Sequence, residues 1–162
     1  MDIIQGGEVY YGDGKKAASL IKATYYGIYF GAHWAPPCRL FTTTLGDFYK
    51  EVNKDSTENE KVLEVLFVSL DGNHEAFLRN FKLMPWLGVS CNEEGRVSSL
   101  KQKFGINGIP TLVITNQNGE LISYDGRKDI QDGVDSALKT WLGKVNQAKG
   151  GAQGQEQQID TK

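Results

Sequence analysis

The sequence predicts an α/β domain in which a central mixed β-sheet is flanked by helices on both faces. Three observations support this fold class: two long apolar runs separated by a helical pattern, a hairpin signal in the second half of the chain, and an amphipathic helix after the hairpin. The order strand, helix, strand, helix, hairpin and helix gives a sheet of mixed direction. With 162 residues and 40% hydrophobic content, the chain can form one domain with a buried core.

The two central strands are predicted from their composition. Residues Ala23 to Ala32 (ATYYGIYFGA) and Lys61 to Asp71 (KVLEVLFVSLD) are rich in aromatic and β-branched residues without strict alternation. This pattern is typical of strands that are buried on both faces. Between them, Pro36 and Pro37 suit the first turn of a helix, because proline lacks the N–H that this turn leaves unpaired. Apolar residues at helical spacing continue that helix through residues 39–54.

The second half of the chain alternates in the same way. Helices are predicted over His74 to Met84, before a proline, and over Gly95 to Gly105. The segments TLVIT and ELISY are predicted strands, because the NQNG between them is a strong hairpin signal. A single amphipathic helix over Lys128 to Val145 then closes the domain and carries Trp141.

Composition excludes several classes of function. The net charge of −2 and the scattered lysines give no basic stripe for nucleic acid, and no apolar run is long enough to span a membrane. The amino terminus has neither the basic nor the apolar region of a signal or transit peptide, and two cysteines are too few for a secreted disulfide framework. We therefore expect an intracellular, cytoplasmic protein with a domain over residues 1–145 and a polar low-complexity tail over residues 146–162.

One short stretch carries the chemistry of the sequence. The segment GAHWAPPCR (31–39) has the outline of a C-x-x-C dithiol motif, but Ala35 stands where the first cysteine would be, and Cys38 provides the second. In such a motif the first thiolate attacks a substrate disulfide and the second releases the reduced product. The start of a helix lowers the pKa of the first thiol through unpaired N–H groups and the helix dipole. With alanine at position 35, this two-electron cycle cannot run. Cys38 alone could still form a one-sided mixed disulfide, but it is expected to be shielded, and the favoured interpretation is a small buried hydrophobe without chemistry.

Four segments in order resemble the nucleoredoxin and tryparedoxin branch of the thioredoxin superfamily. The segment IYFGAHWAPPCRLFTTTLGDFYKEV is similar to the branch pattern Tyr-Phe-Ser-Ala-x-Trp-Cys-Pro-Pro-Cys-Arg-x-Phe-Thr. The other three are VLFVSLD, MPWLGV and FGINGIPTLVITNQNGELISYDGR. The resemblance covers residues 6–142 and implies a thioredoxin fold. Two residues depart from the pattern: Ala35, which replaces the nucleophile of the family, and Gly31, which stands where the branch commonly has serine.

The resemblance also implies a peptide-binding surface. In family members a cis peptide bond precedes a proline that faces the dithiol loop, and the residue before this proline pairs its backbone with an extended substrate. Ile109 and Pro110 match these positions. From the residues alone, an ordinary trans proline and core tryptophans remain alternatives. On the family match, the residues expected to line the surface are Trp34, Pro36, Pro37, Trp86, Ile109 and Pro110.

Other combinations of cysteine and histidine residues give weaker evidence for a functional site. Cys38, Cys91, His33 and His74 lack the short repeated spacing of a structural zinc site, so we expect no metal and no cofactor. A Cys38–Cys91 bridge would need Cα atoms within about 7 Å, and the family alignment places Cys91 away from the helix start.

Two functions stay open at this stage. The first is a redox-inactive binding or structural subunit that lost the nucleophilic cysteine and kept the fold. It would have a protein or peptide partner at the surface around WAPPC and Pro110, and a larger assembly would order the carboxyl-terminal tail. The second is a protein-disulfide oxidoreductase present as a cysteine-to-alanine variant. Fold alone does not decide between a binding protein and an enzyme.

Overall fold

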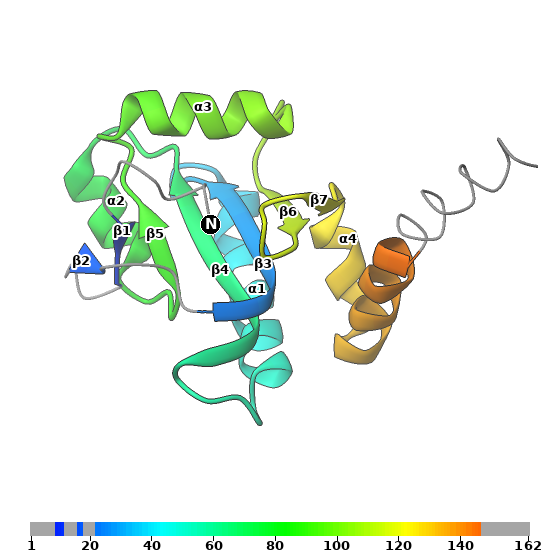
Figure 1. The fold of residues 1–162 in the computed structure, drawn as a ribbon. Coiled ribbons are helices and arrows are strands. Elements are labelled where there is room, and N and C mark those ends of the chain that lie inside the picture. Colours follow the sequence, from blue (N-terminus) through cyan, green and yellow to red (C-terminus); the bar gives the residue numbers. More distant parts are fainter. Residues whose placement is uncertain (1–8, 12–15, 18–21, 147–162) are drawn as a thin grey trace, which may run out of the picture.

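The computed structural model describes residues 9–11, 16–17 and 22–146. Strands and helices alternate along this part of the chain (Figure 1). In order, the elements are β1 (Val9–Tyr10), β2 (Lys16–Ala17), β3 (Lys22–Gly31), α1 (Pro36–Val52), β4 (Glu60–Ser69), α2 (His74–Phe81), β5 (Leu87–Val89), α3 (Glu94–Phe104), β6 (Thr111–Thr115), β7 (Leu121–Ser123), α4 (Gly126–Asp129), the 3-10 turn η2 (Ile130–Asp132) and a helix of residues 134–146.

The seven described strands form one mixed sheet in the order β2-β1-β5-β4-β3-β6-β7. The three central strands β3, β4 and β5 run parallel. β1 is antiparallel to β5, and β6 is antiparallel to β3. Parallel neighbours need helical crossovers, and α1 and α2 provide them. The predicted mixed sheet is confirmed.

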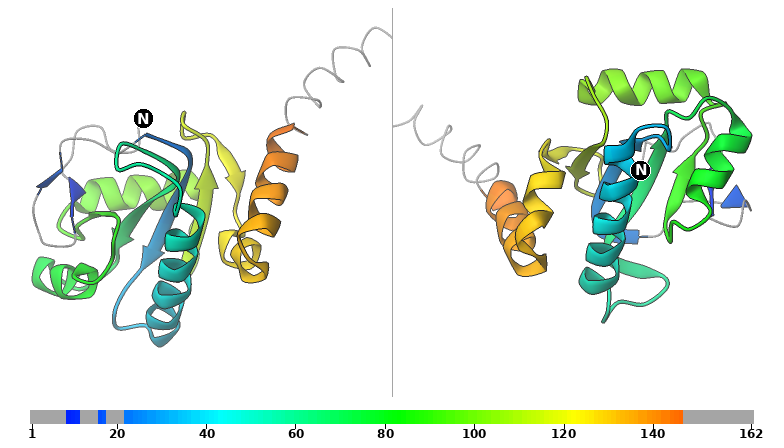
Figure 2. Two further views of the ribbon diagram at one scale, coloured as in Figure 1. Left: turned by 90° about the horizontal axis from the view of Figure 1, so that it is seen from below. Right: turned by 180° about the vertical axis from the view of Figure 1, so that it is seen from behind.

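Helices cover both faces of the sheet and create two cores. One core contains side chains of α1, α2 and the helix 134–146 together with those from one face of the sheet. The other core is formed by α3 on the opposite face, through Val97, Leu100 and Phe104. In the view from behind in Figure 2, α1 lies in front of the sheet and α3 runs along the top.

The predicted final helix is interrupted. The structure has α4, η2 and a helix of residues 134–146 where one helix was expected, and Gly133 separates the last two with φ 96°. This left-handed region of φ favours glycine, because a Cβ would crowd the backbone there. The break redirects the chain so that Trp141 becomes fully buried against Tyr25 and Phe48.

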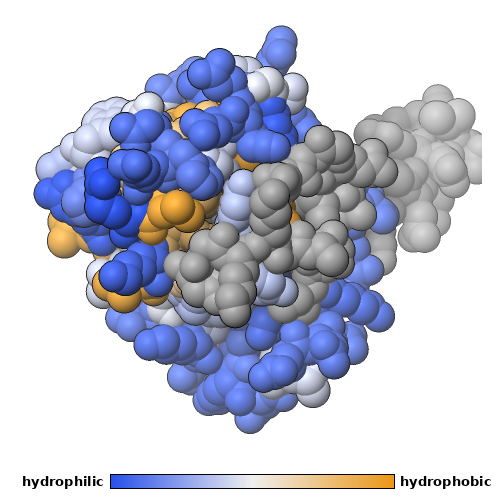
Figure 3. Space-filling view, turned by 90° about the vertical axis from the view of Figure 1, so that its left-hand side faces the viewer, coloured by the Kyte–Doolittle hydropathy of each residue, from blue (hydrophilic) through white to orange (hydrophobic). Residues whose placement is uncertain are grey.

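The structure describes the two ends of the domain only in part. The strands β1 and β2 had no sequence prediction, and they are too short to show a periodic pattern. Asn146, the first residue of the predicted tail, is helical, and the rest of that tail lies outside the described residues. Among residues 9–11, 16–17 and 22–146, no helix is both long and apolar enough to cross a membrane. The face in Figure 3 is mostly hydrophilic, with small hydrophobic patches.

A buried carboxyl group predicts a pH dependence of stability. Glu64 on β4 is 1% exposed, and its Oε1 accepts hydrogen bonds from the Tyr49 hydroxyl and the Val65 N–H, both at 2.9 Å. Burial raises the pKa of Glu64, and these two bonds and nearby Lys61 offset part of the rise. A raised pKa means that the folded state holds this proton more tightly than the unfolded state. Protonated Glu64 therefore makes its full contribution to stability below the pKa that this group has in the unfolded chain. The contribution is lost as the pH rises through the pKa of Glu64 in the folded chain.

Glu64→Gln removes this dependence and keeps an oxygen acceptor. We expect Glu64→Gln to become more stable relative to the unmodified chain as the pH rises from 4 toward 8. The measurement is the difference between the two free energies of unfolding in urea. The control is Glu60→Gln at the exposed start of the same strand, where the difference should stay flat. A flat difference for Glu64→Gln as well would contradict the argument.

Candidate functional site

The parallel strands end together at one edge of the sheet. Gly31 pairs with Ser69 at the last position of the β3–β4 ladder, and the Leu70 N–H donates to the carbonyl of Gly31 at 2.9 Å. On the other side of β3, Thr111 pairs with Phe30 in the antiparallel ladder. Pro110 therefore lies beside the end of β3, where the loop 32–35 begins. The carboxyl ends of parallel strands are the usual place for a site in such a sheet.

A buried aspartate holds the loop in place. Asp71 is 6% exposed, and its Oδ1 accepts the backbone N–H of His33 at 2.9 Å. Its Oδ2 accepts the Ser69 hydroxyl at 2.7 Å and the Asn80 side-chain amide at 3.3 Å. From the helix side, Arg39 Nη1 donates to the carbonyl of His33 at 2.6 Å. The loop is thus fixed directly by Asp71, which follows β4, and by Arg39 of α1, while Ser69 of β4 and Asn80 of α2 hold Asp71 in place.

Trp34 is exposed and fixed at the same time. Its side chain is 65% exposed, yet Nε1 donates to the carbonyl of Leu70 at 3.0 Å. The indole edge is therefore bonded to the backbone after β4 while much of the ring remains accessible to solvent. A tryptophan held in this way can offer apolar contact area with little loss of conformational freedom.

The first turn of α1 contains the alanine and the cysteine of the motif. Ala35 is the N-cap residue, and its carbonyl accepts the Cys38 N–H at 2.9 Å. The first two helical positions are Pro36 and Pro37, which have no N–H to offer. A thiolate at position 35 would therefore lack the full set of free N–H groups that most helix starts offer. It would be stabilised by the helix dipole and by the residues around the first turn.

Cys38 is buried and poorly suited to attack. It is 2% exposed, and burial raises the pKa of its thiol. A bond from the backbone of Ala32 and the charges of Arg127 and Arg39 offset part of this rise. Because the thiolate is the nucleophile, a shielded thiol with a raised pKa reacts slowly.

Tyr29 lies directly below this turn. Its hydroxyl donates to the carbonyl of Cys38 at 3.0 Å and contacts Thr42 Oγ1 at 2.7 Å. Burial raises the pKa of Tyr29 far above its usual value. The side chain is therefore a neutral phenol that supports the helix start, and it does not act as a base near neutral pH.

The Ile109–Pro110 peptide bond is cis, and Arg127 connects this segment to the helix. Arg127 Nη1 donates to the carbonyl of Pro110 at 3.0 Å, and its guanidinium lies over the Phe41 ring at 5.5 Å. The same guanidinium charge lowers the pKa of the Cys38 thiol and so offsets part of the rise that burial causes. Pro110 and Cys38 therefore have a charged neighbour in common.

The structure brings together most, but not all, of the residues predicted to form the surface. Trp34, Pro36 and Pro37 are exposed, Ile109 is half-buried and Pro110 is buried beside them. Trp86 is different: it is 2% exposed and packs edge-on against Tyr49 at 5.3 Å. Trp86 is not exposed beside the other five residues, because the apolar segment around it packs into the core under α1. It lines a neighbouring groove instead.

Sequence reasoning missed Asp71, Arg39 and Arg127. Asp71 had a usable signal, since it is a carboxylate at the end of a buried strand that pairs with β3. Arg127 had a weaker one, as the last residue of a family segment. Arg39 follows Cys38 in the motif, but its contact with the His33 carbonyl depends on the loop conformation, which the sequence does not show.

The remaining cysteine and histidine alternatives find no support. Cys38 and Cys91 are both free thiols. In the part of the chain that the structure describes, no group of three or more histidine, cysteine, aspartate or glutamate side chains is placed to hold a metal ion. His74 instead contacts Ser90 Oγ through Nδ1 at 2.6 Å.

Comparisons with known proteins agree with this geometry. The model of a thioredoxin-like family matches residues 23–121. A nucleoredoxin from Danio rerio is 39% identical over 124 residues, which are 76% of this chain and 29% of that protein. A tryparedoxin from Trypanosoma brucei brucei is 35% identical over 124 residues, which are 76% of this chain and 82% of that protein.

Solved structures show the same fold. A tryparedoxin from Trypanosoma brucei superposes with a TM-score of 0.70 at 31% identity, covering 83% of this chain and 90% of that one. The chain spans less than a third of the nucleoredoxin and most of the tryparedoxin. With its mixed sheet and helices on both faces, it has the thioredoxin fold, and it belongs to the thioredoxin-like family, with nucleoredoxins and tryparedoxins among its homologues.

Proposed function

We propose that this chain binds an extended segment of a partner protein at the Trp34 surface and does not catalyse dithiol–disulfide exchange. The Trp34 surface is defined here as Trp34, Pro36, Pro37, Ile109 and Pro110. One observation carries the proposal: an exposed tryptophan, held by the carbonyl of Leu70, stands next to a position that has no thiol. The apolar docking surface is retained while the attacking sulfur is absent.

The geometry around Ala35 supports binding without chemistry. The carboxylate of Asp71 and the guanidinium of Arg39 fix the loop backbone from two sides, so the surface exists before a partner arrives. Cys38, the one sulfur of the motif, is buried under this surface, where a partner disulfide has little access.

The test uses peptides selected from a library of random nonapeptides displayed on phage. Peptides that bind the unmodified chain are titrated by calorimetry into the chain and its variants. Trp34→Ala should weaken binding roughly 30-fold, as expected for an aromatic residue that contributes about 2 kcal/mol at the centre of an interface. Cys38→Ser should bind like the unmodified chain.

The matched control is Leu121→Ala. Leu121 is another exposed apolar residue, but it lies on the edge strand β7. Its replacement should leave the affinity unchanged. Equal binding by Trp34→Ala and the unmodified chain, or failure of the library to yield any binding peptide, would overturn the proposal.

A second candidate is protein-disulfide oxidoreduction by a form of this chain that has cysteine at position 35. The observation in its favour is that Cys38 is a free thiol in the first turn of α1. The homologues named nucleoredoxin and tryparedoxin also point to redox chemistry. The two candidates share one docking surface and differ in a single atom at position 35.

A further inference from the structure

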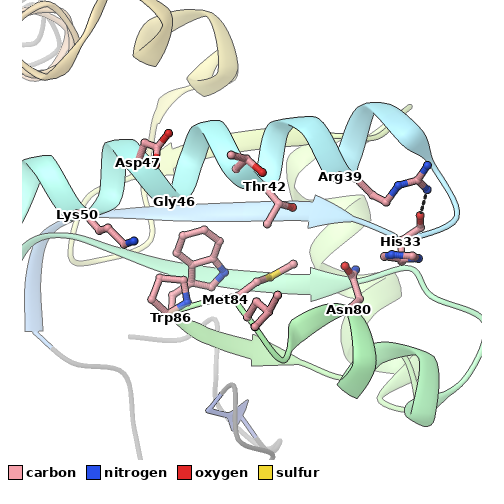
Figure 4. Close-up of a pocket in the computed structure, with 12 residues that line it drawn as sticks. His33, Arg39, Thr42, Gly46, Asp47, Lys50, Asn80, Met84 and Trp86 are labelled. Atoms are coloured by element: carbon pink, nitrogen blue, oxygen red, sulfur yellow. Dashed lines mark hydrogen bonds between the residues drawn. The ribbon is translucent and has the colours of Figure 1, made fainter.

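A groove lies next to the loop that carries Trp34. It has a volume of about 370 Å³ and lies between α1 and the segment after α2 (Figure 4). The side of α1 from Arg39 to Lys50 forms one wall, and residues 80–86 form the other. His33 lies at one end of the groove, so the groove begins at the loop that carries Trp34. Its volume is within the range of sites that bind small ligands or a few peptide residues.

Trp86 lines this groove with a hydrogen-bond donor that has no acceptor. The side chain is 2% exposed, and Nε1 has no hydrogen-bond partner among the residues that the structure describes. Figure 4 shows the indole nitrogen facing Met84 inside the groove. The other tryptophans differ, because Trp34 donates to the Leu70 carbonyl and Trp141 donates to Asp129 Oδ2 at 2.9 Å. A buried donor without an acceptor destabilises a protein by about 1–3 kcal/mol, so it is rarely kept without a reason.

Gly46 provides a second, independent observation. It lies in the middle of the 17-residue helix α1 and forms part of the groove wall. Its φ is not positive, and a Cβ at this position would meet nothing within 4 Å. Neither backbone conformation nor packing therefore requires glycine, although glycine inside a helix is less stable than alanine by about 1 kcal/mol. The missing side chain leaves the groove open at its middle.

The charges and the apolar rim indicate the kind of occupant. Arg39 and Lys50 place cationic groups toward the two ends of the groove, and Asp47 is the single carboxylate among its described lining residues. On the opposite wall Leu83 is 90% exposed, next to buried Met84. A ligand with hydrogen-bond acceptors, an acidic group and an apolar side chain complements these features.

We propose that the groove binds an extended, acidic and apolar segment of a partner protein. An apolar side chain of that segment covers Leu83, and a carboxylate faces Arg39 or Lys50. Because the Trp86 indole nitrogen is itself buried, the segment must displace a neighbouring side chain before one of its backbone carbonyls accepts this N–H. This inference rests on the proposed function, because the groove reaches His33, the residue before Trp34, and one extended segment would contact both the groove and the Trp34 surface. It adds the chemistry of the partner and a second contact region.

The three tryptophans provide the test. In an amide-nitrogen correlation NMR spectrum of the ¹⁵N-labelled chain, each indole N–H gives its own signal, and the nonapeptides selected from phage are titrated in. The Trp86 signal should move downfield as its N–H gains an acceptor, the Trp34 signal should move as the loop is covered, and the Trp141 signal should stay. If Trp34 moves and Trp86 does not, the groove proposal fails while the proposed function stands. If Trp86 moves and Trp34 does not, the Trp34 surface is refuted and the groove is retained.

Two substitutions of Gly46 complete the test. Gly46→Trp fills the groove from a helix position with free space, and it should lower the affinity for the selected peptides roughly tenfold or more. Gly46→Ala adds only a methyl group, so it should lower the affinity less than Gly46→Trp does. The matched control is Thr44→Trp, at an exposed position of the same helix that does not line the groove, and it should leave the affinity unchanged. The selected peptides should contain an acidic residue near a large apolar one, and replacing the acidic residue by lysine should weaken binding about tenfold. Full binding by Gly46→Trp, or selection of basic peptides, would overturn the proposal.

Discussion

Ala35→Cys is expected to convert this chain into a disulfide reductase. With dithiothreitol as electron source, the variant should reduce insulin at a rate on the order of 100-fold or more above that of the unmodified chain, since an absent nucleophile removes many powers of ten of catalysis. The substitution adds one sulfur at the N-cap of α1, next to exposed Trp34 and one turn before the free thiol of Cys38.

The expected chemistry balances between the two sulfurs. The thiolate at position 35 attacks one sulfur of an insulin disulfide, the S–S bond breaks, and the other insulin sulfur leaves and takes a proton. The sulfur of Cys38 then attacks the mixed disulfide, which releases the second insulin thiol and joins positions 35 and 38. Two electrons have passed to insulin, and dithiothreitol returns the pair to the dithiol form.

Two control variants separate this cycle from other effects. Ala35→Ser has nearly the same size as the cysteine variant and should stay inactive. The double variant Ala35→Cys/Cys38→Ser should form a mixed disulfide that persists, without turnover. An inactive Ala35→Cys variant that is folded would show that the site around Cys38 no longer supports exchange, and the oxidoreductase candidate would then be rejected.

Trp141→Ala is expected to cause the largest loss of stability among single substitutions outside the sheet. Trp141 is fully buried, packs against Tyr25 at 5.3 Å and Phe48 at 6.0 Å between ring centroids, and donates to Asp129. Truncating a buried tryptophan to alanine lowers the free energy of unfolding by about 3–5 kcal/mol. Urea unfolding followed by circular dichroism should show this change.

The neighbouring residue is the matched control. Leu142 is 54% exposed on the same helix, and Leu142→Ala should change the free energy of unfolding by about 0.5 kcal/mol or less. This pair also tests the extent of the domain, because the family match ends at residue 121 while Trp141 anchors the helix 134–146. Equal stabilities of the two variants would mean that this helix does not contribute to the core.

The sequence was most informative where local pattern and tertiary environment agree. The apolar runs of β3 and β4 and the two prolines at the start of α1 each determine their element nearly alone, and the observed bounds differ from the predicted ones by one or two residues. The final helix was predicted as one piece because its apolar periodicity continues across Gly133. The turn at Gly133 follows from the tertiary structure, in which Trp141 is buried in the core, and not from the local sequence pattern.

The sequence predicts the main residues of the candidate site but not the side chains that hold them in place. The loop, Cys38 and Pro110 follow from the motif and the family resemblance. Trp86 could not be placed, since a tryptophan next to a proline is equally compatible with a surface and with a core position, and its burial depends on the packing of α1 against the segment before β5. Asp71 and Arg127 act through contacts with residues 38 and 17 positions away, which no local pattern encodes.

The central claim is that this chain binds partners without exchanging disulfides, and insulin reduction by the unmodified chain tests it most directly. With dithiothreitol present, the rate should equal that of dithiothreitol alone and should be the same for Cys38→Ser. A rate clearly above that background, lost in Cys38→Ser, would contradict the account, because it would show that the buried sulfur in the first turn of α1 is a working nucleophile.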